Sequence, residues 1–227
     1  MAVARRRVLT LSAAMIGVPA CAPLPGAAVG VPPPRRVFYE FNGPLVPEQL
    51  WQVDPTAPAI RLVSGALRLQ SGPSQTAFVR ARFVEGAPGP AAGTAESLEW
   101  HAEVAMSGAY FIVLDAQFDR SPFRVQLAPF GLHVTSAASG QPPQGAEIRK
   151  PGGWQSQPHK WQLTRAGEAV SLLVDGEPLW RGEVASALTS ASFGETHVDA
   201  LHGGVMLLRS VRWERVEYPG GPRGANR

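Results

Sequence analysis

The segment Glu99-Trp-His-Ala-Glu103 carries the ionisable side chains whose spacing best suits chemistry. On an extended strand, side chains alternate between two faces, so Glu99, His101 and Glu103 share one face. A retaining glycoside hydrolase needs two carboxyl groups about 5–5.5 Å apart, one as nucleophile and one as general acid and base. Cα atoms four residues apart on a strand lie about 13 Å apart, so this pair would need local twist to converge. A solvated polar face without a catalytic role is the simpler interpretation.

Tryptophans offer a second route to a ligand, because an exposed indole stacks on the apolar face of a sugar ring. Trp154 lies in the Gly- and Gln-rich segment 151–158 and is the best candidate for such a contact. We therefore predict that a ligand, if one binds, contacts Glu99, His101, Glu103 and Trp154. Trp51 is expected at an edge of the fold. The tryptophans within apolar runs are expected in the core: Trp100, Trp161 and Trp180.

Other kinds of site lack their sequence signals. The five histidines are scattered, with no His-x-x-x-His pair and no carboxylate-rich loop, so we predict no metal site and no cofactor. The Gly-x-Ser-x-Gly segment of many hydrolases is missing as well. The formal net charge of +3 is accounted for by Arg5, Arg6 and Arg7, which leaves the remainder neutral. Nucleic acid is therefore not expected as a partner, because it requires a basic surface.

The elements that would position these side chains are strands. Polar and apolar residues alternate with a period of two in 77–83, 98–104 and 123–127, which is typical of antiparallel sheets with one buried face. Turn signals separate the runs, and Asp175-Gly176 is the clearest because both residues tolerate the positive φ of a type I′ turn. The pattern predicts an all-β, two-sheet antiparallel sandwich. Short helices are expected only near residues 45–50 or 184–190.

Three segments carry a family resemblance. Residues 159–180, with a Trp-led strand, a short turn, an apolar strand and an Asp-Gly turn, resemble the central hairpins of the concanavalin A-like lectin/glucanase (laminin G-like) superfamily. Residues 38–43 and 203–213 are similar to the first and last strands of that superfamily. The resemblance implies a jelly-roll sandwich over residues 37–218. Its members include lectins, glycoside hydrolases, lyases and adhesion modules, so the fold alone does not give the function.

The resemblance also gives the candidate residues specific roles. The segment 99–103 is similar to the Glu-x-Asp-x-Glu strand of the sandwich-fold glucanases, which places Glu99 at the nucleophile position and Glu103 at the acid/base position. His101 stands where that family has Asp, so the sequence departs from the pattern at its centre. A structural calcium ion is common in the resembled fold, and its candidate oxygen ligands here are Asp115 or Asp119.

The N-terminal residues predict export. A basic run at Arg5–Arg7 is followed by an apolar stretch and by Cys21, which indicates a signal peptide over residues 1–20. The arginines resemble a twin-arginine signal, and Val18-Pro-Ala-Cys21 resembles a bacterial lipobox, which implies lipidation of Cys21 and attachment to a membrane of the cell envelope. A Pro-rich linker is expected at 21–36 and a flexible tail at 219–227.

The function that best fits these features is a non-catalytic module at the cell envelope that binds a glycan or another envelope polymer. Two alternatives remain open. One is a carbohydrate-active enzyme, either a glycoside hydrolase or a polysaccharide lyase, in which Glu99 and Glu103 are catalytic. The other is a module that binds another envelope protein through a sheet face.

Overall fold

The computed structural model describes residues 35–41, 51–53, 60–83, 94–119, 121–137, 144–184 and 186–217. All described residues belong to one compact unit, Val31–Arg227. The predicted signal peptide, Cys21 and the tail at 219–227 lie outside the described residues. The first strand begins at Arg35, within the segment predicted to be linker, because Arg35 and Arg36 pair with the last strand. Among the described residues, no helix is long and apolar enough to cross a membrane.

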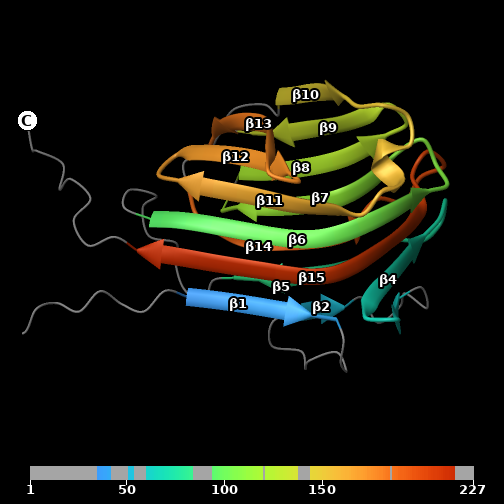
Figure 1. Ribbon diagram of the computed structural model, residues 1–227, viewed down its shortest axis with the longest axis horizontal. Coiled ribbons are helices and arrows are strands. Elements are labelled where there is room, and N and C mark those ends of the chain that lie inside the picture. Colours follow the sequence, from blue (N-terminus) through green and yellow to red (C-terminus); the bar gives the residue numbers. More distant parts are fainter. Residues whose placement is uncertain are drawn as a thin grey trace, which may run out of the picture. The chain divides into compact units, whose positions relative to one another are not determined.

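Two antiparallel sheets make up the domain, as the sequence predicts. The first sheet has eight strands. Seven of them follow one another in this order: β13 (Glu177–Glu183), β12 (Ala169–Val174), β11 (His159–Ala166), β6 (Thr94–Met106), β15 (Gly204–Glu217), β4 (Ala66–Ser71) and β3 (Ile60–Val63). The eighth strand, β1 (Arg35–Glu40), pairs with β15 beside β4. Figure 1 shows β6 and β15, far apart in the sequence, side by side at the middle of this sheet.

The second sheet is seven-stranded and has the order β10 (Gln144–Arg149), β9 (Gly131–Ser136), β8 (Ser121–Ala128), β7 (Phe111–Phe118), β14 (Leu188–Glu195), β5 (Ala77–Arg82) and β2 (Trp51–Val53). The only helix in the described part of the chain is the short 3-10 helix η1 (Trp154–Ser156). The helix predicted near 184–190 is wrong, because residues from Leu188 onward pair with β5 and β7 as strand β14. The helix predicted near 45–50 lies outside the described residues.

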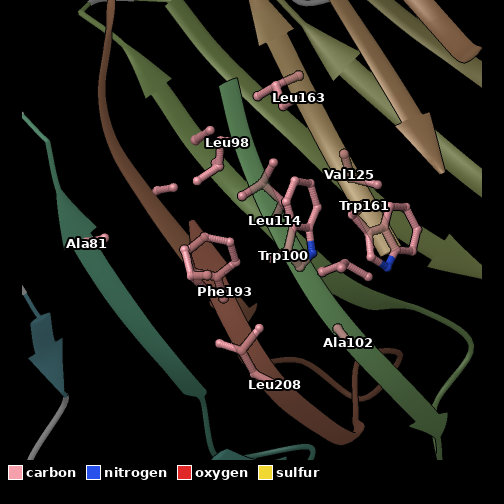
Figure 2. Packing of buried hydrophobic residues seen from close by; sticks show 14 of the residues in the cluster. Ala81, Leu98, Trp100, Ala102, Leu114, Val125, Trp161, Leu163, Phe193 and Leu208 are labelled. Atoms are coloured by element: carbon pink, nitrogen blue, oxygen red, sulfur yellow. The ribbon is translucent and has the colours of Figure 1, made fainter. Parts of the chain in front are cut away.

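The core lies between the sheets and is built by the predicted alternation. On β6 the side chains of Leu98, Trp100, Ala102 and Val104 are buried, and the residues between them are half-buried on the opposite face. The Trp100 ring stacks on Trp161 at a centroid distance of 5.7 Å and meets the edge of Phe193 at 5.8 Å. Figure 2 shows these three rings packed together. The prediction that Trp100 and Trp161 are core residues is confirmed.

Trp180 also belongs to this packing, although its side chain is only half-buried. Its ring meets Phe123 at a centroid distance of 5.2 Å, so β13 covers part of the second sheet. Trp51 is in β2, the terminal strand of that sheet, which agrees with its predicted place at an edge.

A buried charge cluster ties the strands β6, β11 and β15 to β14. Arg165 Nε and Arg215 Nε donate to the two carboxylate oxygens of Glu96 at 2.6 Å and 2.7 Å. The same carboxylate accepts the backbone N–H of Leu188 at 3.0 Å, and Arg215 Nη2 donates to the Leu188 carbonyl. Because Leu188 begins β14, these bonds join the two sheets through a network that satisfies the buried charges.

The Asp175-Gly176 turn between β12 and β13 has the predicted conformation. Both residues have positive φ, 53° and 83°, as a type I′ turn requires. The Asp175 carboxylate contacts His159 Nδ1 at 2.6 Å and accepts the Lys160 backbone N–H at 2.8 Å. Partial burial raises the pKa of Asp175, but these hydrogen bonds outweigh it and hold the pKa below its ordinary value. The carboxylate therefore fixes the turn to β11.

Candidate functional site

Strand β6 places the predicted residues on the outer face of the first sheet, as the alternation predicts. Glu99, His101 and Glu103 are all half-buried there. Glu99 forms an ion pair with Lys160 at 2.9 Å, and Glu103 lies 3.7 Å from Arg209. Lys160 belongs to β11 and Arg209 to β15, which flank β6 on opposite sides. The two carboxylates are therefore held by cations on opposite edges of their strand.

A shallow hollow of about 200 Å³ opens beside Glu99. Its lining is polar and consists of Ser97, Glu99, Gln162, Arg212 and Glu214. Gln162 donates to Ser97 at 3.2 Å, and Arg212 lies 3.5 Å from Glu214. The polar groups that line the hollow therefore mostly bond to one another. No aromatic ring lines the hollow, so it lacks the flat apolar surface that sugar rings favour.

Trp154 does not join Glu99, His101 and Glu103. Its ring lies 4.1 Å from the His159 ring and 5.9 Å from the Trp161 ring, measured between centroids. Both of those side chains are buried on the core side of β11, so Trp154 packs at the core side of the sheet rather than at its outer face. Gly153, which precedes Trp154, has φ 84° and permits a turn there. A hydrogen bond of 2.8 Å between His159 Nε2 and the Trp154 carbonyl holds this turn in place. The predicted four-residue contact surface is therefore not assembled.

The outer face of the second sheet carries a different set of polar side chains. On β8, Arg124 and Gln126 alternate with three buried apolar residues and so point outward. Arg124 Nη2 donates to Asp115 Oδ2 at 2.7 Å across the β7–β8 ladder. Thr196 donates to the same Asp115 oxygen at 3.2 Å. Asp115 thus links β8 to the connection between β14 and β15.

Two histidines of that connection complete the contacts of β8. Arg124 Nη1 donates to His197 Nε2 at 3.0 Å, and Gln126 Nε2 donates to His202 Nε2 at 3.1 Å. A ring nitrogen that accepts a hydrogen bond carries no proton, so we assign the Nδ1–H tautomer to both rings. In His202 this proton is donated to Asp199 Oδ1 at 2.7 Å.

Tyr110 and His133 extend these side chains into a row of rings. The Tyr110 ring lies 6.2 Å from His133 and 5.7 Å from His202, and His202 lies 5.5 Å from His197, measured between centroids. Tyr110, His133 and His197 are half-buried, as are the two polar side chains of β8, whereas the side chain of His202 is only 10% exposed. We call the following six residues the ring face: Tyr110, Arg124, Gln126, His133, His197 and His202.

Backbone contacts hold Tyr110 beside His202. The N–H of Tyr110 donates to the Leu201 carbonyl at 3.0 Å, and the N–H of Gly203 donates to the Tyr110 carbonyl at 3.2 Å. Gly108 permits this close approach, because a Cβ at that position would lie 2.5 Å from the Leu201 oxygen. The turn before β7 and the segment before β15 therefore position the two rings together.

Two carboxyl groups support the ring face from behind and from the side. Glu195 is fully buried and accepts the backbone N–H groups of Ile112 and His197 at 3.0 Å and 2.9 Å. Burial raises the pKa of Glu195, and the two hydrogen bonds oppose that rise only in part. The hydrogen bond from His202 lowers the pKa of Asp199, which therefore stays ionised beside the imidazole.

No part of the described chain brings three or more His, Cys, Asp or Glu side chains together as a metal site. Of the two candidate calcium ligands, Asp115 is bonded to the Arg124 guanidinium, which competes with a cation for the same oxygen. Asp119 lies in the β7–β8 turn with φ 50°. The structural calcium implied by the resemblance stays a prediction.

Sequence reasoning missed the ring face because its members come from positions between 110 and 202. The alternation of Arg124 and Gln126 with apolar neighbours showed only that these residues point outward. The contacts of β8 with His197 and His202 depend on β7 pairing with both β8 and β14, and the sequence does not state that strand order.

No family model and no curated protein matches the chain. Solved structures with the same fold include the laminarinase catalytic domain of Thermotoga maritima, which is 9% identical, with 78% of this chain and 96% of that chain covered and a TM-score of 0.61. SCLam, a non-specific endo-β-1,3(4)-glucanase of family GH16, is 13% identical over 81% of this chain and 92% of its own, with a TM-score of 0.59. The receptor-binding domain of botulinum neurotoxin D is 8% identical over 74% of this chain and 45% of that one, with a TM-score of 0.54. The protein thus shares the two-sheet jelly-roll sandwich fold of these structures, as the sequence predicts.

Proposed function

We propose that this protein is an exported, lipid-anchored β-sandwich that binds a glycan at the ring face. The observation that carries the proposal is the row of four rings, Tyr110, His133, His197 and His202, in contact with outward-pointing polar side chains on one sheet face.

The chemistry of this face matches that of a sugar. Ring surfaces pack against the C–H faces of a pyranose, and planar polar groups such as those of Arg124 and Gln126 bond to its hydroxyls. Both polar side chains are already held by neighbouring residues, so little conformational entropy is lost when a ligand binds. The predicted face on β6 offers charges and the single ring of His101 rather than a row of rings.

The solved structures of the same fold support a carbohydrate ligand. They include the glucanases described above and a botulinum neurotoxin D binding domain in complex with N-acetylneuraminic acid, which is 8% identical to this chain. Such a likeness indicates the fold and leaves the ligand to the site itself.

The N-terminal sequence supports the anchor. A lipidated Cys21 with two or three acyl chains would give stable membrane attachment, which a single chain does not. We expect the Cys21→Ala variant to lose acylation and to leave the membrane fraction, whereas a Ser12→Ala variant, changed in the same signal, keeps both. Acylation of Cys21→Ala at the parental level would contradict the anchor.

A glycan array with the full chain in detergent identifies the ligand, and titration then tests its site. We expect Tyr110→Ala to raise the dissociation constant by roughly 5- to 150-fold, which corresponds to about 1–3 kcal/mol for an aromatic contact. The matched variant Glu103→Gln, on the outer face of the other sheet, should bind within about twofold of the parent, because a surface charge outside the site contributes little.

The reverse result, with Glu103→Gln impaired and Tyr110→Ala unchanged, would place the ligand on the β6 face that the sequence predicts. If no glycan binds, the proposed function is wrong.

A further inference from the structure

We propose that the connection between β14 and β15, residues 196–203, is a pH-sensitive clasp, which His197 holds closed while it is neutral and releases when it is protonated. The movement of the clasp does not depend on a ligand. Its consequence, the loss of glycan binding in acid, rests on the proposed function and describes the regulation of the same site.

The clasp is fastened at its two ends. Residues 198–201 at its centre are exposed, whereas His197 and His202 at its ends contact side chains of β8. Backbone hydrogen bonds to Tyr110 hold its C-terminal end. An exposed segment opens at a lower cost in free energy than the core strands beside it. The contacts at the two ends therefore decide whether the clasp stays closed.

The contact between Arg124 and His197 requires a neutral imidazole. A guanidinium group only donates hydrogen bonds, so the lone pair of His197 Nε2 accepts from Arg124 Nη1 at 3.0 Å. Protonation of Nε2 removes this lone pair and places a second positive charge beside the guanidinium. The contact then becomes repulsive, because Arg124 has no acceptor to offer in exchange.

Asp115 keeps Arg124 in place when the imidazole is protonated. Arg124 Nη2 donates to Asp115 Oδ2 at 2.7 Å, so the guanidinium is held on β8 by a charge-assisted hydrogen bond. Thr196, at the start of the clasp, donates to the same oxygen at 3.2 Å. We therefore expect His197, on the exposed connection, to move away from Arg124.

His202, in contrast, tolerates protonation. Its Nδ1–H is donated to Asp199, and this hydrogen bond lowers the pKa of Asp199, so the carboxylate stays ionised in mildly acidic solution and balances an imidazolium charge. The partner of Nε2 is Gln126, whose amide can rotate and offer its oxygen in place of its NH2 group. The pH response of the clasp therefore comes from His197.

The other titratable groups around His197 do not replace the lost contact. Glu195 accepts the backbone N–H of His197 at 2.9 Å, and burial raises the pKa of Glu195, so this hold also weakens as the pH falls. The ring of His202 lies 5.5 Å from that of His197, so two imidazolium rings would repel each other. Tyr110 and His133 lie beyond His202 in the row of rings.

Release of the clasp takes apart the ring face. His197 and His202 supply two of its four rings, and the Leu201 carbonyl accepts the N–H that positions Tyr110. Imidazole side chains ordinarily change charge between about pH 5 and pH 8. A glycan held at neutral pH should therefore be released in mildly acidic solution.

Hydrogen exchange tests the clasp amide by amide, with the full chain in detergent at about pH 7.5 and about pH 5.5. The reporter amides bond at the ends of the clasp and belong to Tyr110, His197 and Gly203. After correction for the intrinsic effect of pH on exchange, we expect their protection to fall by about tenfold or more in acid, as the loss of a hydrogen bond to a charged group implies. The amides of the β8–β9 ladder should stay protected, which excludes global unfolding.

The His197→Gln variant isolates the role of the imidazole. Its amide oxygen can accept from Arg124 at both pH values, so the reporter amides should keep most of their protection in acid. His133→Gln is the matched control, because it removes another imidazole of the ring face and should lose protection as the parent does. Equal losses in the parent and in His197→Gln, or no loss in the parent, would overturn the inference.

A glycan array read at both pH values tests the consequence for the ring face. The parent should lose its signal in acid, whereas His197→Gln should retain it. Undiminished binding by the parent in acid would overturn the regulation inferred here. A parent that binds no glycan at either pH would refute the proposed function, and the exchange measurements would still decide whether the clasp opens.

Discussion

Replacing Glu96 by Gln should destabilise the fold strongly, because Glu96 balances the charge of two buried arginines. The Glu96 side chain is 2% exposed, and those of Arg165 and Arg215 are 1% and 6% exposed. The variant keeps the shape and an acceptor for the Leu188 N–H, but it leaves two buried guanidinium groups without a counter-charge. Breaking a buried ion pair on one side costs about 3–5 kcal/mol.

We expect a loss at the lower end of this range, about 3 kcal/mol, since Arg165 also donates to the Gly167 carbonyl and Arg215 to the Leu188 carbonyl. The measurement is urea unfolding. With a slope of about 1–3 kcal/mol per molar urea, the midpoint should fall by roughly 1–3 M at an unchanged slope.

Two comparisons make this result specific. Glu147→Gln removes a 60%-exposed carboxylate 3.8 Å from Arg149 and should change the unfolding free energy by less than about 0.5 kcal/mol. Adding Arg215→Met to Glu96→Gln should restore part of the loss, since one unpaired charge disappears. If Glu96→Gln loses less than about 1 kcal/mol, the cluster does not contribute as argued.

Three further predictions concern the turns. Gly176→Val should lower the unfolding free energy by more than about 1 kcal/mol, because a β-branched residue resists the positive φ of this position. A steric clash does not contribute, since nothing lies within 4 Å of the Cβ position. An unchanged urea midpoint would contradict the type I′ turn. The pKa of Asp175 is lowered in the folded state, so the stabilisation from its carboxylate is complete above the unfolded pKa and is lost as pH falls through the folded pKa. The urea midpoint should therefore fall less between neutral and acidic pH in Asp175→Asn than in the parent. An equal fall of the midpoint in the two proteins would refute the link. Gly108→Ala places a Cβ 2.5 Å from the Leu201 oxygen. The free energy of glycan binding, measured by titration, should change by more than the free energy of unfolding.

Local patterns predicted the strands because burial on one face imposes a period of two. The alternation on β6 correctly separates buried Trp100 from half-buried Glu99 and His101. Asp175-Gly176 was equally predictable, since turn chemistry depends on two adjacent residues. In both cases the information is contained within a few consecutive positions.

Side-chain placement in loops and across strands was not predictable in this way. A Gly- and Gln-rich segment suggested an exposed Trp154, but the buried ring of His159 provides a surface on which the indole packs. Likewise, the histidines of the ring face looked scattered until strand pairing brought His197 against Arg124. Both outcomes depend on contacts between residues that the sequence pattern does not relate.

The five histidines make it possible to test the location of the glycan in one experiment. Imidazole nitrogen NMR spectra of the full chain in detergent are recorded while the array-identified glycan is added. We predict that the resonances of His133, His197 and His202 shift with saturation, while those of His101 on the β6 face and buried His159 stay in place. A saturable shift of His101 with the three ring-face histidines unchanged would contradict the proposed site.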